Sequence, residues 1–429
     1  MAAIGRPSAS GVFLNITSTT SWKVVVTAAF FVALTGPSSG FPQGSLRDRT
    51  GPSTKLRTGL GGQELEPLRI KGLWILRESM VDREEIDAAL TFARESGFNH
   101  VFVQVRGRGD AYYNSLLVPK SPLVRDSRFD PLVYAVTRGH ELGLNVHAWV
   151  TTYLLWSART PPETGNHAYH MHPEWLEVDA GGNAHRDIDL GAPRNESFEG
   201  IFLSPVHPEV NGYLQAVFTE ILLNYNIDGL HLDYCRFADL DYGYNEEGLG
   251  VFRSRYGFDP RDINRMQNRS TGNETNQGLD GKLEVWNDYR RRKVTDLTTA
   301  LHAVITLSGK EIMLTAAVKP NAKVARHKYY QDWLQWLRDG ILDYALPMNY
   351  TPELDEYMQN VTIVSDSLSE RFRSRVIMGV ATYNQDALAT AEKIRVARLY
   401  GFEAVCVFSY DSHKTNLAHF KPILEMLNR

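Results

Sequence analysis

The segment Asp228-Gly-Leu-His-Leu-Asp-Tyr, residues 228–234, decides the fold of this chain. It has the length and the apolar content of a β-strand, and its side chains alternate, so that His231 and Asp233 lie on the same side. A long polar connection follows it directly. These features are typical of a parallel strand that is covered by helices and ends at a functional surface.

Seven further segments have the same form, and amphipathic helical patterns separate them. The first helical pattern begins with Asp82 as its N-cap and ends at Gly97 as its C-cap. Strict alternation of strands and helices favours a closed barrel over an open doubly wound sheet, so we predict an α/β (β/α)₈ TIM barrel. The other strands are expected at residues 71–76, 100–105, 145–150, 312–318, 344–350, 375–383 and 404–410, and the other helical patterns at 130–143, 208–225, 332–340 and 386–401.

Two connections are much longer than the rest, and both follow strand ends. Residues 151–207 follow the third strand and residues 235–285 follow the fourth. Long connections in a compact domain are usually functional or disordered. Residues 269–281 have the composition of a mobile excursion. No glycine-rich phosphate-binding motif follows any strand, which argues against a nucleotide-binding protein.

The N-terminal part differs in composition from the predicted barrel. The apolar run at residues 24–36 is too short to span a bilayer comfortably, so residues 1–36 are expected to be a signal peptide, with a signal anchor or organelle targeting as alternatives. Residues 37–67 are expected to be a disordered linker, and residues 68–429 the barrel. The chain is therefore expected to be secreted or extracytosolic, and to contact a membrane only if the apolar run is kept. Glycosylation sequons favour the same compartment, at Asn15, Asn195, Asn268, Asn273 and Asn360.

Composition limits the classes of partner. A net charge of −4 provides no basic field for nucleic acid, so no nucleic-acid partner is expected. The 20 tyrosines and 8 tryptophans suit a protein that stacks aromatic rings on sugars, although they also suit ordinary core packing. The two cysteines, Cys235 and Cys406, belong to different strands, so no disulfide between them is expected.

Two carboxylates follow strands at the predicted functional face. Asp233 ends the fourth strand, where a negative charge would stabilise an oxocarbenium-like transition state as nucleophile or base. Asp110 follows the second strand and is the candidate proton donor. The structural alternatives are an ion pair with Arg236 or an adjacent lysine for Asp233, and a loop cap or an ion pair with Arg106 or Arg108 for Asp110. The further candidate acids are Glu78, Asp241, Glu246 and Asp411.

Other polar and aromatic residues close to strand ends are candidate sugar ligands. Two histidines and Asp233 could instead share a metal ion, but their spacing forms no strong metal motif, so neither a metal nor any other cofactor is predicted. The predicted substrate-binding residues are Arg106, His147, Trp149, Tyr153, His231, Tyr234, Lys319, Asn349 and Tyr350.

Several of these segments together resemble a known family, the glycosyl-hydrolase-like family 10, over residues 68–425. The carrying segments are KGLWIL (71–76), FVQVRGRGDAYYNS (102–115), LGLNVHAWV (142–150), HPEWL (172–176), LSPVHPEV (203–210), YNIDGLHLDYCRF (225–237) and YALPMNY (344–350).

The resemblance implies a (β/α)₈ fold and hydrolysis of O-glycosyl bonds, in some members of cell-wall glycan or another extracellular polysaccharide. It places Asp233 and Asp110 at the family's acidic positions. Many bacterial relatives have two consecutive acids where this chain has Asp233 and then Tyr234, so the second catalytic carboxylate stays open.

Three hypotheses follow. The first is a glycosidase that cleaves an extracytosolic polysaccharide or oligosaccharide by two-carboxylate acid/base catalysis. The second is a barrel that binds carbohydrate without cleaving it, which fits the absence of a glutamate at the end of the fifth strand. The third is a metal-dependent glycan deacetylase.

Overall fold

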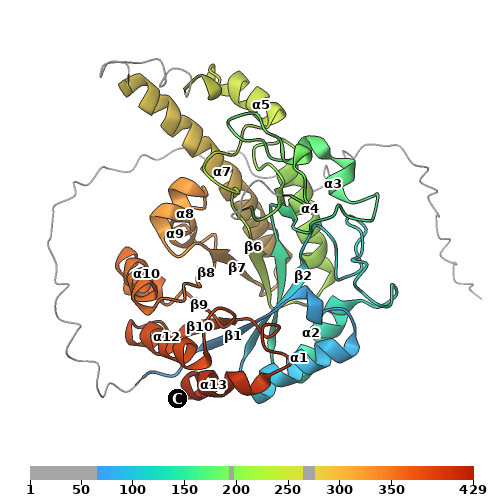
Figure 1. Ribbon diagram of the computed structural model, residues 1–429, viewed down its shortest axis with the longest axis vertical. Coiled ribbons are helices and arrows are strands. Elements are labelled where there is room, and N and C mark those ends of the chain that lie inside the picture. Colours follow the sequence, from blue (N-terminus) through green and yellow to red (C-terminus); the bar gives the residue numbers. More distant parts are fainter. Residues whose placement is uncertain (1–64, 193–197, 264–275) are drawn as a thin grey trace, which may run out of the picture. The chain divides into compact units, whose positions relative to one another are not determined.

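Eight parallel strands close into a barrel, which confirms the predicted fold class. The computed structural model describes residues 65–192, 198–263 and 276–429 (Figure 1). The strand order around the barrel is β1-β10-β9-β8-β7-β6-β3-β2, and β1 pairs with both β2 and β10. The strands are β1 (Ile70–Ile75), β2 (His100–Arg106), β3 (Asn145–Thr151), β6 (Gly229–Asp233), β7 (Met313–Val318), β8 (Tyr344–Asn349), β9 (Met378–Ala381) and β10 (Ala404–Phe408).

Helices surround the barrel, and their ends follow the capping chemistry of the sequence (Figure 1). Asp82 caps the first helix, because its side chain accepts a hydrogen bond from the backbone N–H of Glu85 at 2.9 Å. The helices of the main alternation are α1 (Arg83–Glu95), α2 (Pro131–Glu141), α4 (Val210–Asn224), α7 (Asn276–Ser308), α8 (Ala322–Lys328), α9 (Trp333–Arg338), α10 (Leu354–Ser367), α12 (Ala387–Leu399) and α13 (Lys421–Asn428).

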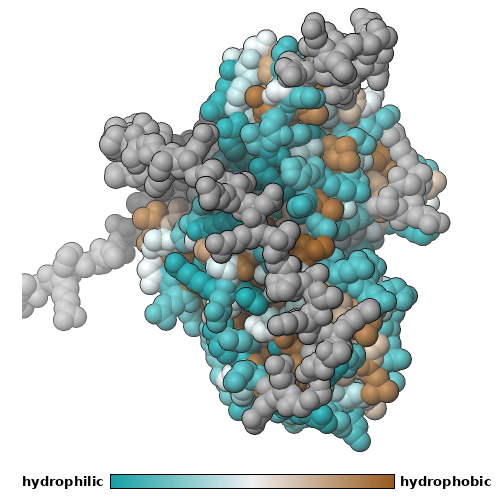
Figure 2. Space-filling model, turned by 90° about the vertical axis from the view of Figure 1, so that its left-hand side faces the viewer, coloured by the Kyte–Doolittle hydropathy of each residue, from teal (hydrophilic) through white to brown (hydrophobic). Residues whose placement is uncertain are grey.

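The strands separate two apolar cores. The larger core fills the layer between the strands and the outer helices. The smaller core fills the inside of the barrel with large side chains, among them Trp74, Phe102 and Trp149. The inside of the barrel is therefore filled with side chains and does not form a pore. Figure 2 shows one outer face, where hydrophilic residues predominate and hydrophobic ones form scattered patches.

The described parts of the two long connections contain helices and strands of their own. The first contains a small antiparallel pair, β4 (Leu154–Trp156) with β5 (Ile201–Phe202), and the short helix α3 (Ala168–Met171). The second contains α5 (Glu246–Tyr256). The predicted excursion at residues 269–281 is wrong from residue 276 onward, because α7 begins there and runs for 33 residues; its earlier part lies outside the described residues.

A buried carboxyl joins these two connections. Glu177 accepts hydrogen bonds from the backbone N–H of Gly243 at 3.0 Å and of its neighbour Val178 at 3.3 Å. The backbone N–H of Tyr244 also donates to the carbonyl of Val178 at 3.0 Å. Glu177 is fully buried, and burial raises the pKa of its carboxyl to about 8. The two connections are thereby fixed to each other.

The remaining predictions about chain organisation concern the cysteines and the N-terminal segment. Cys235 and Cys406 are both buried and both free, as expected. Among the described residues, no helix combines the length and apolar character needed to cross a membrane. The predicted signal segment, residues 1–36, and most of the predicted linker lie outside the described residues, as do the sequons at Asn15, Asn195, Asn268 and Asn273.

Candidate active site

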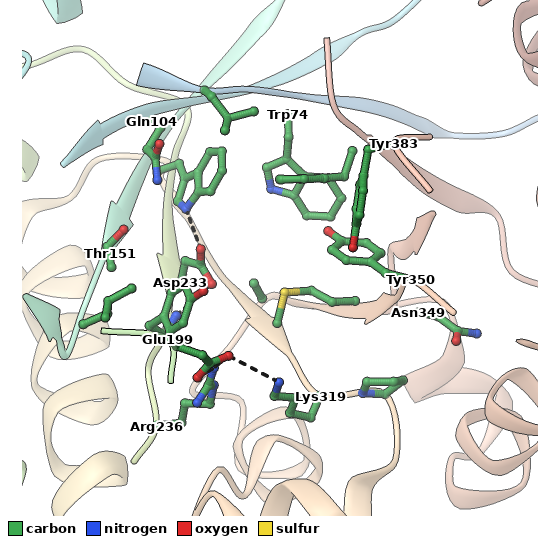
Figure 3. Close-up of a pocket in the computed structure, with 18 of the residues that line it drawn as sticks. Trp74, Gln104, Thr151, Glu199, Asp233, Arg236, Lys319, Asn349, Tyr350 and Tyr383 are labelled. Atoms are coloured by element: carbon green, nitrogen blue, oxygen red, sulfur yellow. Dashed lines mark hydrogen bonds and ion pairs between the residues drawn. The ribbon is translucent and has the colours of Figure 1, made fainter. Parts of the chain in front are cut away.

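A cavity of about 810 Å³ opens where the barrel strands end (Figure 3). Side chains from the strand ends and from the long connections share its wall. Carboxylate, cationic and aromatic groups meet there, as in sites that bind a polar ligand with flat apolar faces. The lining residues that carry charge or an aromatic ring are Trp74, Arg77, Trp149, Glu199, Asp233, Tyr234, Arg236, Lys319, Tyr350, Glu356, Tyr383 and Phe408.

Asp233 is held at the bottom of this cavity by hydrogen bonds to both carboxyl oxygens. The indole Nε1 of Trp149 donates to Oδ2 at 3.1 Å, and the backbone N–H of Tyr234 donates to Oδ1 at 2.8 Å. The residue is only 6% exposed. Burial raises the pKa of Asp233 to about 6, against the lowering effect of these two hydrogen bonds and of Arg236. The carboxyl can therefore hold a proton in mildly acidic solution.

Glu199 supplies a second carboxylate to the cavity, and nothing in the sequence analysis identified it. It comes from the connection after β3, two residues before the start of β5. The Arg236 Nη2 donates to its Oε1 at 2.8 Å and to its Oε2 at 2.7 Å, and the Lys319 ammonium lies 3.9 Å from Oε1 (Figure 3). The charge of Glu199 also acts on Asp233 and raises its pKa. Glu199 is thus held beside Asp233 by charge-assisted contacts with two cations.

Aromatic rings form the opposite part of the wall. The rings of Tyr350 and Phe408 stack with centroids 5.2 Å apart, and the ring of Trp74 meets Tyr350 edge-on at 6.2 Å. Tyr383 stands at the rim with 56% of its surface exposed. Flat rings that face a polar cavity suit the C–H faces of sugar rings, so this wall fits a carbohydrate.

Asp110 does not line this cavity, contrary to the expectation that it faces Asp233. Its Oδ1 accepts a hydrogen bond from the backbone N–H of Arg108 at 3.1 Å, and its side chain lies in the turn after β2. This is the loop-cap role that the sequence allows as the alternative to catalysis. The carboxylate that lies beside Asp233 in the cavity is Glu199.

Arg106 and Tyr153 also lie outside the cavity lining, for different reasons. The pairing of β2 with β3 shifts register between Gln104 and Arg106, so strict alternation fails there: Gln104 lines the cavity and Arg106 does not. The Arg106 guanidinium lies 5.8 Å from the ring of Phe218 on α4. The hydroxyl of Tyr153 donates a hydrogen bond to Oδ1 of Asn211, on α4, at 2.7 Å. Both side chains pack between the barrel and its helices.

His147 and His231 lie deeper in the barrel, below the cavity. His231 precedes Asp233 by two residues, about 6.6 Å along the strand. Its Nε2 accepts from the indole of Trp74 at 3.2 Å, and its Nδ1 contacts Thr315 at 2.9 Å. Burial lowers the pKa of His231 to about 3 and that of His147 well below its usual value. In residues 65–192, 198–263 and 276–429, no group of three or more His, Cys, Asp or Glu side chains is arranged to hold a metal ion.

Asn349 borders the cavity, but its amide is bound to α10. Its Nδ2 donates to the carbonyl of Tyr357 at 3.1 Å, and its Oδ1 accepts from the side chain of Asn360 at 3.0 Å. Asn360, which begins one of the predicted sequons, also lines the cavity. Of the predicted site residues, the structure brings together Asp233, Trp149, Tyr234, Lys319, Asn349 and Tyr350.

Comparisons with known proteins identify the family and the fold of this chain. The family model described as glycosyl hydrolase-like 10 matches residues 69–393. Glycosyl hydrolase DigH of Escherichia coli (strain K12) is 25% identical over 308 residues, which are 65% of this chain and 59% of that protein. Glycosyl hydrolase YngK of Bacillus subtilis (strain 168) is 24% identical over 290 residues, which are 62% of this chain and 49% of that protein. The chain thus spans less than two thirds of the length of these relatives.

Among solved structures, the glycoside hydrolase domain of PgaB (BpsB) from Bordetella bronchiseptica is similar, with a TM-score of 0.62 at 15% identity. The match covers 84% of this chain and 98% of that domain. At this identity the similarity shows a shared fold.

Proposed function

This chain belongs to the glycosyl hydrolase-like 10 family, and from that premise we propose that it is a glycosidase with Asp233 and Glu199 as its catalytic carboxyls. The family and the shared fold support a function like that of glycoside hydrolases. The observation that carries the finer proposal is the pair itself: a buried carboxyl with a raised pKa, next to a carboxyl that contacts two cations, in a cavity at the strand ends.

In this proposal Asp233 is the general acid. Its pKa of about 6 keeps a share of the enzyme protonated in mildly acidic solution. The proton passes to the glycosidic oxygen as the bond from that oxygen to the anomeric carbon breaks, and the leaving sugar departs as an alcohol. The Asp233 carboxylate that remains is then a base that can take a proton from the attacking water.

Glu199 supplies negative charge to the same step. An oxocarbenium-like transition state carries positive charge on the anomeric carbon, and a fixed carboxylate nearby lowers its energy. Arg236 and Lys319 both contact the Glu199 carboxylate, whereas burial favours the protonated form of Asp233. The two carboxyls thus have different surroundings, one buried and one paired with cations.

We further propose that the substrate is an extracytosolic polysaccharide or an oligosaccharide derived from one. The aromatic wall supports a sugar ligand, and the apolar run at residues 24–36 supports export or anchoring. Immunoblotting of secreted, membrane and cytosolic fractions tests the location; recovery from the cytosolic fraction alone would refute it.

The test of the activity compares wild type with Asp233→Asn on a panel of soluble polysaccharides and cell-wall glycan, by release of reducing ends. The amide has the same shape as the carboxyl but cannot donate an acidic proton. We expect release by wild type on at least one glycan and loss of at least about a hundredfold in the variant. Equal release by both proteins would refute the proposal.

A barrel that binds carbohydrate without cleaving it is the second candidate. The observation in its favour is that both oxygens of Glu199 already contact Arg236. It predicts saturable binding of a glycan with no release of reducing ends, and loss of that binding in Tyr350→Ala. Turnover that depends on Asp233 excludes it.

A further inference from the structure

Tyr234, the residue after Asp233, has a backbone conformation that is unusual for a tyrosine. Its φ angle is +49°, in the left-handed region that glycine and asparagine adopt more readily than residues with large side chains. Within the described residues, Tyr330 is the one other non-glycine residue with positive φ. Residues in such conformations cluster at functional sites, and Tyr234 lies next to the proposed catalytic carboxyl of Asp233.

The turn connects Tyr234 to Asp233 and to its neighbours. The backbone N–H of Tyr234 donates to Asp233 Oδ1 at 2.8 Å. Its carbonyl accepts from the backbone N–H groups of Arg236 at 2.9 Å and of Tyr153 at 3.2 Å. The peptide groups on both sides of Tyr234 are therefore held, and the carboxyl of Asp233 is oriented by them.

The ring connects Tyr234 to Glu199 through Arg236. The Arg236 guanidinium lies 4.8 Å from the centroid of the Tyr234 ring and 4.8 Å from that of Tyr329. Its Nη1 donates to the carbonyl of Phe237 at 3.0 Å, which leaves Nη2 directed at both oxygens of Glu199. The arginine side chain is only 2% exposed. Aromatic packing thus fixes the cation that orients Glu199.

We propose that Tyr234 is a positioning residue for both carboxyls: its left-handed turn orients Asp233 and its ring holds Arg236 against Glu199. The inference rests on the proposed function for its catalytic meaning, because it assigns a role within the same site. The hydroxyl of Tyr234 has no part in it. Asparagine at this position keeps the turn and removes the ring, whereas phenylalanine keeps the ring and removes the hydroxyl.

The experiment determines crystal structures and kinetics of Tyr234→Asn and Tyr234→Phe. In Tyr234→Asn we expect the contact of Arg236 with Glu199 to open beyond 4 Å, while Asp233 keeps the backbone hydrogen bond. On a glycan that wild type cleaves, kcat should fall about tenfold to a hundredfold with little change in KM. Tyr234→Phe should keep the contact between Arg236 and Glu199, and its kcat should stay well above that of Tyr234→Asn.

The matched control is Tyr330→Asn. This tyrosine is also left-handed, with φ of +55°, and its ring also packs on an arginine, Arg290, at 4.0 Å, but it does not line the cavity. It should lose stability while kcat stays near wild type. An unchanged contact between Arg236 and Glu199 in Tyr234→Asn, or an equal fall in kcat in Tyr330→Asn, overturns the proposal. The structural measurement needs no substrate, so it decides the positioning role even if no glycan is cleaved.

Discussion

The indole Nε1 of Trp149 donates a hydrogen bond to Oδ2 of Asp233, at 3.1 Å. A residue of β3 thereby orients the carboxyl at the end of the neighbouring strand β6. The bond stabilises the ionised carboxylate and so lowers the pKa of Asp233, which burial raises. The indole is therefore one of the groups that oppose the effect of burial on the acid strength of Asp233.

The Trp149→Phe variant tests this relationship. Phenylalanine keeps an aromatic ring and removes the donor, so the pKa of Asp233 should rise above its value of about 6. A general acid acts only while protonated, so kcat/KM should fall as the pH rises through that pKa. We expect the alkaline limb of the pH–rate profile to move to higher pH in the variant. A limb at the same pH would contradict this role of the indole.

The buried histidines predict acid sensitivity of the fold. Burial lowers the pKa of His100 to about 4 and that of His231 to about 3, whereas an unfolded chain binds these protons near pH 6.5. Between pH 6.5 and these lower values the unfolded state therefore binds more protons than the folded state. The contribution of the neutral histidines to the free energy of unfolding is full above about pH 6.5 and is lost as the pH falls.

The His100→Asn variant isolates one of these groups. The asparagine amide can replace the contact of His100 Nδ1 with His147 Nε2, which is 2.9 Å long, and it does not titrate. We expect the free energy of unfolding of the variant, measured in urea, to increase relative to that of wild type as the pH falls from 6.5 to 4. The increase should be at most about 1.4 kcal/mol per pH unit. A constant difference would show that His100 has an ordinary pKa.

Glu177 predicts the opposite dependence. Its folded-state pKa of about 8 lies above its usual value of 4.5. The protonated carboxyl makes its full contribution to the free energy of unfolding below about pH 4.5, and this contribution is lost as the pH rises toward 8. Glu177→Gln keeps the shape without the charge, so its unfolding free energy relative to wild type should rise between pH 5 and 8. Parallel curves for the two proteins would contradict the buried state of this carboxyl.

Gly229 predicts a large packing effect at the base of β6. A Cβ at this position would overlap the imidazole of His147. Gly229→Ala should destabilise the fold by about 1–3 kcal/mol, measured by urea unfolding, because the barrel interior is closely packed. Gly212→Ala is the control: it lies in α4 with no atom near the new Cβ, and alanine favours a helix. Equal stability of the two variants would refute the overlap.

The sequence predicts the barrel well because its alternation of short apolar strands and amphipathic helices is regular. The strand ends follow from it, and with them Asp233, Trp149 and Lys319 as residues of the cavity. Glu199 was not predictable in this way. It lies in a connection of 57 residues without periodicity, and its position depends on β4, β5 and Arg236, which are distant in the sequence.

A local irregularity explains why Arg106 lies outside the cavity, and depth in the barrel explains why His147 and His231 do. The register shift at the end of β2 turns Arg106 out of the barrel, although its spacing from Gln104 predicts the same face. The depth of His147 and His231 in the barrel also cannot be predicted from alternation, because alternation gives the face on which a side chain lies but not its layer along the barrel axis. A count of layers from the end of each strand could have placed both histidines below the cavity.

The central claim is that Glu199, and not Asp110, acts with Asp233. The most direct measurement is the release of reducing ends by Glu199→Gln and Asp110→Asn, on a glycan that wild type cleaves and Asp233→Asn does not. We predict a loss of at least about a hundredfold in Glu199→Gln, because the transition state loses its fixed negative charge, and activity within about tenfold of wild type in Asp110→Asn. Full activity in Glu199→Gln together with loss in Asp110→Asn would contradict the account.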